Sequence, residues 1–480
     1  NGVWGLDAEN PALMRLLLLM LAAGAGLHAH VGSPDVIYDG LAGKYRLLVT
    51  IRPPMIVPGV AEIEIRSLSP GVRELRIVPL RLTGAGAKFA PTPDVARRSK
   101  DDPQFFTGSL WLMSVGAWQV RIHAEGDQGP GELSVPVSVL PASTRSMQAG
   151  IGAVLFILMM ILAVGIVSIV AASVREGQVD PGRQPMPSRI RRSRVIMATT
   201  SVVVAGIIWW SNGWWNAEAR NYSRIVYKPL ELAASLDPPN QLMLRMSDPG
   251  WLQRKVDDLI PDHTHLMHLY VIHLPEMERV WHLHPDQVAA GAFVQQLPDM
   301  GAGRYQLFGD VVHASGIAET LTAELELPQV AGKTLAGDDA YGVGPELSKS
   351  SRATVAQLSG ERRMVWESGG GLRAKQVSLF RFRVEPATKL EPYMGMLGHA
   401  AFVKTDRSVF AHVHPSGSVP MAALSLTGVG ADPHAGHSMS AGTSEVSFPY
   451  GFPQAGDYRI YVQIKIEGRV ETGVFDAHVN

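Results

Sequence analysis

Polar and apolar residues alternate along much of this 480-residue chain, in short runs separated by turn residues. Residues 61–66 (Ala-Glu-Ile-Glu-Ile-Arg) alternate strictly. A period of two is typical of strands with one buried face, whereas an amphipathic helix repeats every 3.6 residues. Together with 48 Gly and 33 Pro, the pattern predicts a mainly β protein, and the length predicts about three domains.

The first domain is predicted at residues 30–142, where five such runs follow one another without a helical period: residues 45–52, 61–66, 106–113, 118–123 and 133–139. This spacing favours an antiparallel β-sandwich. The segments Leu110-Trp-Leu-Met113, Gly116-Ala-Trp118 and Val135-Pro-Val137 resemble those of YtkA-like domains, which are small immunoglobulin-like sandwiches of secreted and membrane proteins. The resemblance implies an immunoglobulin-like fold, and a fold does not by itself imply a function.

Two uncharged apolar runs interrupt the β pattern, at residues 149–174 and 195–215. Each is long enough to cross a lipid bilayer as a helix. Between them, residues 175–194 hold six Arg against one Glu and one Asp, so the positive-inside rule places this loop in the cytoplasm. Four Trp at positions 209, 210, 214 and 215 indicate an aromatic belt at the outer end of the second span. The sequence thus predicts a two-span protein of the bacterial inner membrane with its large domains in the periplasm.

Residues 1–29 are predicted to be a secretory signal peptide, with Met14 as a candidate true start. Arg15 precedes a short apolar run, and small residues around Ala29 suit cleavage. The alternative is a retained anchor helix. Cleavage after Ala29 would leave His30 as the first residue. The segment His28-Ala-His30 resembles the start of mature CopC-type copper-resistance proteins, and this resemblance implies that the N-terminal histidine is a copper ligand.

Six of the sixteen histidines fall within residues 263–285, and the pattern returns about 130 residues later. Residues 259–268 align without a gap on residues 390–399, which sets His263 against Met394, His265 against Met396 and His268 against His399. After a one-residue deletion, His282-Leu-His284-Pro285 aligns on His412-Val-His414-Pro415. Gly303 and Gly456 each open a further matching strand. Two tandem sandwiches of related fold are therefore predicted, at residues 217–345 and 346–480.

Histidines two apart on a strand project from the same face. In each copy a hairpin turn, at residues 275–279 or 405–408, would return the chain so that His268 meets His282 and His284, and His399 meets His412 and His414. Three converging imidazoles make a metal site. The alternative is that these are hydrogen-bonded or surface histidines of a sandwich, which is what we expect of the isolated His123, His313 and His478.

The metal is predicted to be copper, with zinc as the alternative. The chain has no cysteine, which excludes disulfides, thiolate zinc sites and a blue copper centre. Neutral imidazoles suit copper(II) or zinc, and thioethers favour copper(I). A loop near residue 435 resembles the copper-gathering loops of secreted copper proteins. The predicted ligands are His263, His265, His268, His282, His284, Met394, Met396, His399, His412, His414, His434, His437 and Met439.

These patterns predict a membrane-anchored periplasmic protein that captures, buffers or transfers copper, with a copper transporter or chaperone as partner. The net charge of −1 gives no basis for nucleic-acid binding. No nucleophile elbow, phosphate loop or HExxH helix is present, so no catalytic residue is predicted and the chain is expected not to be an enzyme. The alternatives are a scaffold subunit, resembling FixH-like assembly factors, and a redox enzyme with a type 2 copper site.

Overall fold

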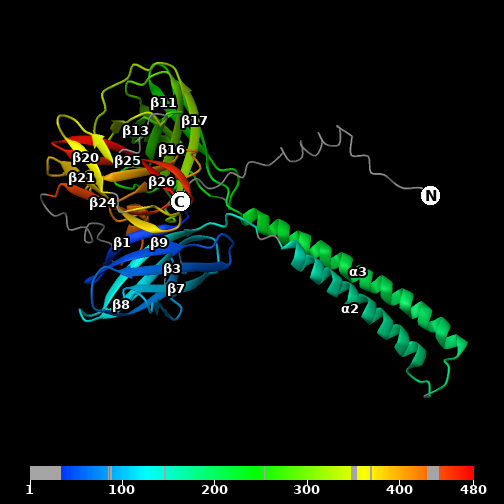
Figure 1. The fold of residues 1–480 in the computed structure, drawn as a ribbon. Coiled ribbons are helices and arrows are strands. Elements are labelled where there is room, and N and C mark those ends of the chain that lie inside the picture. The colour runs from blue at the N-terminus through cyan, green and yellow to red at the C-terminus, as the bar shows by residue number, and fades with distance from the viewer. Residues whose placement is uncertain are drawn as a thin grey trace, which may run out of the picture.

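A computed structural model describes residues 34–480, apart from residues 85, 87, 88, 145, 146, 181, 253, 348–353, 368, 369 and 430–442. The predicted signal peptide, His28, His30, His434, His437 and Met439 lie outside the described residues. Within the described part, three β-rich units form one body, from which a helical hairpin projects (Figure 1). The mainly β prediction is confirmed, and every paired strand is antiparallel.

The N-terminal unit consists of two sheets that share one core. Its strands are β1 (Val36–Ala42), β2 (Tyr45–Arg52), β3 (Gly59–Ser67), β4 (Val72–Arg81), β5 (Asp94–Val95), β6 (Arg97–Arg98), β7 (Phe105–Leu112), β8 (Gly116–Gly126) and β9 (Gly131–Val139). They form the sheets β1-β2-β3-β7-β6 and β5-β4-β8-β9. Alternation explains the core: Ala61, Ile63 and Ile65 of β3 are buried, whereas Glu62 and Arg66 are exposed.

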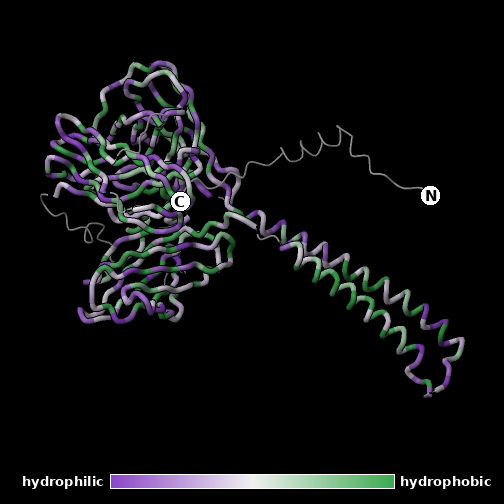
Figure 2. Tube along the Cα trace, viewed as in Figure 1, coloured by the Kyte–Doolittle hydropathy of each residue, from purple (hydrophilic) through white to green (hydrophobic). Residues whose placement is uncertain are grey.

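The two helices are α2 (Ala149–Glu176) and α3 (Pro187–Ile225), and both are long and apolar enough to cross a membrane. Their apolar side chains are exposed along the hairpin, and its far end is hydrophilic (Figure 2). Helix α3 extends beyond the predicted residues 195–215 at both ends. Pro187 occupies the first helical turn, where proline is tolerated, and residues 216–225 contain no Gly or Pro to end the helix.

The second unit contains β10 (Glu231–Asp237), β11 (Gln241–Ser247), β12 (His268–Leu274), β13 (Arg279–Leu283), β14 (Asp286–Ala289), β15 (Ala292–Gln296), β16 (Gly303–Val312), β17 (Ala318–Leu327) and β18 (Ala340–Val343). Its sheets are β10-β11-β15-β14 and β17-β16-β12-β13-β18. Strand β18 lies at the end of the second unit. This short strand lies so close to the third unit that a Cβ on Gly342 would meet the Thr472 side chain at 2.4 Å, which explains the glycine there.

The third unit repeats this plan. It contains β19 (Val355–Gln357), β20 (Arg363–Glu367), β21 (Val377–Glu385), β22 (His399–Lys404), β23 (Phe410–Val413), the short helix α4 (Met421–Ser425), β24 (Glu445–Gly451), β25 (Gly456–Ile466) and β26 (Arg469–Val479). Its sheets are β19-β20-β21-β24 and β23-β22-β25-β26. The hairpin β22–β23 corresponds to β12–β13, and β25 begins at its glycine as β16 does.

The second and third units pack against each other through these corresponding sheets. Tyr270 and Phe308 from one side form a single buried cluster with Phe410 and Tyr461 from the other. The Tyr461 hydroxyl donates a hydrogen bond across the interface to the Met277 carbonyl at 2.7 Å. The two histidine-bearing hairpins therefore lie inside an interface between units and not on two separate surfaces.

The N-terminal unit covers one side of this interface. The amide of Asp39 donates to the Ser416 carbonyl at 2.7 Å, and the amide of Ser418 donates to the Ile37 carbonyl at 2.9 Å. Met396 and Met421 of the third unit are buried within the N-terminal hydrophobic core. All three units thus meet around the loop that follows His414.

Candidate metal centre

Eight histidines gather where the β12–β13 hairpin faces the β22–β23 hairpin. Their imidazole rings form a continuous chain of neighbours, with ring centroids 4.0 Å apart for His265 and His284 and 5.2 Å apart for His268 and His412. The members are His263, His265, His268, His282, His284, His399, His412 and His414. We call this set the histidine cluster, and it contains two groups of three that can each hold a metal ion.

The first triad consists of His268, His282 and His284. His268 is the first residue of β12, His282 is paired with Tyr270 across the hairpin, and His284 follows two positions later on the same face. One ring nitrogen from each lies within 4.8 Å of the other two. The Nδ1 atom of His268 and the Nε2 atom of His282 are 3.2 Å apart.

An oxygen acceptor contacts the outer ring nitrogen of each histidine in the first triad. The Nε2 atom of His268 lies 3.1 Å from the Asp262 carbonyl, and the Nδ1 atom of His282 lies 2.8 Å from Oε1 of Gln463. The Nδ1 atom of His284 lies 3.0 Å from Oδ1 of Asp339. A neutral imidazole carries one proton, and these acceptors assign it to the outer nitrogen. The inner nitrogens then present lone pairs, as in the histidine ligands of metal sites.

These inner nitrogens fit a metal ion. Two nitrogens bound tetrahedrally at about 2.0–2.1 Å would lie roughly 3.3–3.4 Å apart, close to the 3.2 Å between His268 and His282. Two lone pairs at that distance repel each other unless a metal ion or a shared proton lies between them. The buried Nε2 atom of His284 makes no hydrogen bond, and such an atom costs about 1–3 kcal/mol unless a ligand satisfies it.

Burial also keeps the first triad uncharged. Desolvation, followed by the influence of neighbouring histidines, holds the pKa of His268 and of His282 well below the usual value of 6.5. Desolvation likewise lowers the pKa of His284 to about 3. All three imidazoles are therefore neutral near pH 7, which is the form that binds metal.

The second triad consists of His263, His399 and His414, and it combines residues of two units. The rings of His399 and His414 lie 5.0 and 4.9 Å from that of His263. The outer nitrogens again meet carbonyl oxygens. The Nε2 atom of His399 lies 3.2 Å from the Tyr393 carbonyl, and the Nδ1 atom of His414 lies 3.2 Å from the Val419 carbonyl.

The second triad differs from the set expected for the second copy. That set comprised Met394, Met396, His399, His412 and His414, all from one domain. The triad shares His399 and His414 with that set and adds His263 from the second unit, while Met396 packs in the hydrophobic core. Met394 is half-buried and adopts a left-handed φ of 49°, like the 48° of His263, as the alignment of the two loops requires.

The remaining two predicted histidines flank the triads. His265 lies beside His284, and its Nε2 atom is 3.2 Å from Oδ2 of Asp338. The Nε2 atom of His412 is 3.1 Å from Nδ1 of His399, and its Nδ1 atom is 3.7 Å from Oδ2 of Asp310. His412 thus lies between the two triads.

Sequence reasoning missed the residues that orient the imidazoles. Gln463, Asp338, Asp339 and Asp310 lie far from the histidine motifs along the chain or on another strand, and no spacing marks them. The hydroxyl of Tyr270, whose ring stacks on His282 at 4.2 Å, is buried and makes no hydrogen bond. These groups surround the imidazoles with polar atoms that the sequence pattern did not identify.

The three isolated histidines have other surroundings. His313 is buried between Asp258, at 2.6 Å from Nδ1, and Glu319, at 2.9 Å from Nε2. Glu319 also binds Tyr227 and Arg254 next to the end of α3, so this cluster connects the helical hairpin to the second unit. His478 is exposed and pairs with Asp457, which matches the expectation of an ordinary surface residue.

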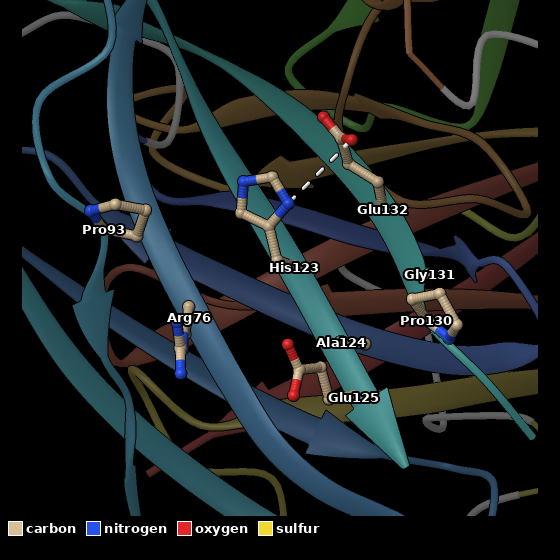
Figure 3. Close-up of a pocket in the computed structure, with 8 residues that line it drawn as sticks. All are labelled: Arg76, Pro93, His123, Ala124, Glu125, Pro130, Gly131 and Glu132. Atoms are coloured by element: carbon tan, nitrogen blue, oxygen red, sulfur yellow. Dashed lines mark ion pairs between the residues drawn. The ribbon is translucent and has the colours of Figure 1, made fainter. Parts of the chain in front are cut away.

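His123 lines an open depression on the N-terminal unit. Figure 3 shows its ring pointing toward Glu132, with which it pairs at 3.9 Å, while Arg76 and Glu125 lie nearby. Glu132 is also paired with Arg121 at 3.0 Å. These half-buried, mutually paired charges give no set of converging ligands.

Comparisons with known proteins find a family model over part of the chain and solved structures of low sequence identity. A family model described as a domain of unknown function (DUF8832) matches residues 357–480, which correspond to the third unit. No curated protein matches. The matching solved structures include a tetra-tandem repeat from the extending region of a large adhesion protein, at 8% identity and a TM-score of 0.17, covering 92% of this chain and 82% of that one.

Two further structures match in the same weak way. A bacterial ice-binding adhesin has 6% identity and a TM-score of 0.15, covering 88% of this chain and 91% of that one. The D1–D4 ectodomain fragment of ICAM-5 has 7% identity and a TM-score of 0.16, covering 90% and 77%. Scores this low support no argument about fold or function.

Proposed function

We propose that this chain is a membrane-anchored, extracytoplasmic copper-binding protein that captures, buffers or passes on copper. The first triad carries the proposal: three neutral imidazoles present inner nitrogens to one another while oxygen acceptors contact their outer nitrogens. That arrangement of ligands and outer partners is the one that protein metal sites use.

The chemistry of the ligands favours copper over zinc as the bound metal. The cluster offers imidazole nitrogens from eight histidines, and among divalent first-row ions copper binds such nitrogen sites most tightly. Zinc remains the second candidate, because three imidazoles also suit it. The burial of His268 and His282, at 2% and 0% exposure, leaves little room for a substrate and favours metal storage or transfer over the alternative of a type 2 copper redox enzyme.

The anchor is proposed to be the α2–α3 hairpin, inserted in the bacterial inner membrane with its arginine-rich turn in the cytoplasm. The three β-rich units, which we propose to be immunoglobulin-like sandwiches, then lie in the periplasm. A reporter that is active only in the periplasm is expected to be active when fused after Asn480. An inactive fusion expressed at a normal level would contradict this orientation.

The copper content of the full-length protein, purified in detergent and dialysed after copper loading, tests the proposed function. We expect copper to be retained in a fixed ratio to protein, and a zinc-loaded sample to exchange its metal for copper. Protein that retains neither metal would disprove the proposal and favour the alternative of a scaffold subunit resembling FixH-like assembly factors.

A further inference from the structure

The two triads are in direct contact through His412. The His412 ring centroid lies 5.2 Å from that of His268 and 5.5 Å from that of His282, both in the first triad. It also lies 5.3 Å from His399 and 4.7 Å from His414, both in the second triad. No main-chain layer separates the two groups, since one side chain touches both.

The loop that carries His263 is held in place for its role in the second triad. The amide of Asp262 donates to the His265 carbonyl at 2.8 Å, and the amide of His265 donates back to the Asp262 carbonyl at 2.9 Å. The Asp262 side chain in turn accepts a hydrogen bond from the amide of Ala422, in α4 of the third unit, at 2.7 Å. This contact fixes a loop of the second unit against the third, with His263 beside His399.

We propose that the histidine cluster is a single dinuclear centre, in which the first triad holds one copper ion and His263, His399 and His414 hold a second. This inference rests on the proposed function and extends it from one ion to a coupled pair. It also replaces the expectation of one independent site in each domain, because the second triad takes a ligand from both units.

The acidic residues around the histidine cluster are compatible with two bound copper ions. Burying two divalent cations close together requires negative charge nearby, because isolated buried charges are costly. Four carboxylates adjoin the cluster: Asp262 is next to His263, Asp310 faces His412, Asp338 faces His265 and Asp339 contacts His284. A bound cation favours the ionised form of a nearby carboxyl, and these four carboxyls, once ionised, would balance the four positive charges of two copper(II) ions.

Electron paramagnetic resonance of the full-length protein in detergent, saturated with copper(II), tests the dinuclear centre. We expect two copper ions per chain and a half-field line, which arises only when two unpaired spins lie close together. His414→Asn and His284→Asn should each reduce the content to one ion and abolish the half-field line. His263→Asn should have the same effect, even though His263 belongs to the second unit whereas His399 and His414 belong to the third. The control His478→Asn should keep both ions and the line.

The outcomes separate this inference from the proposed function. One ion per chain, or two ions that give the full signal intensity of two isolated copper(II) ions and no half-field line, would overturn the dinuclear centre and leave copper binding intact. Two coupled ions in His263→Asn would likewise overturn the assignment of the second triad. The absence of any bound copper in the unmodified protein would overturn both. Thermal unfolding of each metal-free variant checks that it is folded, and the half-buried His263 offers the mildest substitution.

Discussion

Replacing His282 with asparagine is expected to weaken copper binding at the first triad by more than about 100-fold. Removing a residue that only hydrogen-bonds to a ligand already lowers metal affinity by about 10–100-fold, and losing the ligand itself costs more. In the proposed site His282 supplies Nε2 as a ligand atom, which lies 3.2 Å from Nδ1 of His268. Asparagine keeps a polar side chain in the interface but does not reach the position of Nε2. Affinity is measured by competition with a chelator of known copper affinity, using the full-length protein in detergent.

A graded variant distinguishes a ligand from a packing effect. Gln463→Leu removes the acceptor that contacts His282 from the third unit while preserving side-chain volume. It should weaken binding by about 10–100-fold, which is less than the effect of His282→Asn. His478→Asn, at an exposed residue paired with Asp457, is the matched control and should bind like the unmodified protein. Equal affinity in all three variants would show that His282 is not a ligand.

The metal-free protein is expected to lose stability as pH falls below 6.5. Desolvation lowers the pKa of five histidines in the folded state: His268, His282, His284, His399 and His412. The lowered pKa of His284 is about 3. The pKa of all five in the unfolded chain is about 6.5. Between these values the unfolded chain binds more protons than the folded one, so stability present above pH 6.5 is lost as pH falls.

Four carboxyls oppose this loss but are fewer than the histidines. Burial raises the pKa of Asp310 to about 7 and also raises the pKa of Asp262, Asp339 and Asp35, so these carboxyls bind protons more readily in the folded state. The pKa of His313 is raised, because its partners Glu319 and Asp258 outweigh the opposing effect of burial, and below pH 6.5 this histidine is protonated in both states and leaves the slope unchanged. Five histidines against four carboxyls still leave a net loss of stability as pH falls.

Urea unfolding at pH 7.5, 6.5 and 5.5, with chelator present, measures this dependence. A free energy of unfolding that stays constant from pH 7.5 to 5.5 would mean that these histidines are not buried in neutral form.

The same lowered pKa values affect how the first triad should bind metal as pH falls. An ordinary histidine site releases its metal as pH falls through about 6.5, whereas the first triad should retain copper to lower pH.

The sequence was sufficient to predict the strands and each histidine hairpin, because these depend on local periodicity. His268, His282 and His284 converge since a strand, a short turn and a second strand leave them on one face. The internal alignment also holds in detail, down to the shared left-handed backbone of His263 and Met394. Such features are encoded within a few residues and need no knowledge of how domains dock.

What the sequence could not reveal depends on contacts between units. The second triad needs His263 beside His399, which follows from the packing of two sheets against each other, and no spacing in the chain encodes that packing. Met396 aligns with His265, yet it packs in the core of the N-terminal unit, because alignment gives a position in the loop and not the neighbour that a third domain supplies. The ion-paired burial of His313 is equally a product of tertiary packing.

The position of bound copper is the most direct test of a metal centre between the second and third units. Crystals of the full-length protein grown with copper, measured at the copper absorption edge, should show an anomalous peak about 2.0–2.1 Å from three atoms. These atoms are Nδ1 of His268, Nε2 of His282 and Nε2 of His284, which already face one another. Copper bound elsewhere on the protein, with no peak among these nitrogens, would contradict the account.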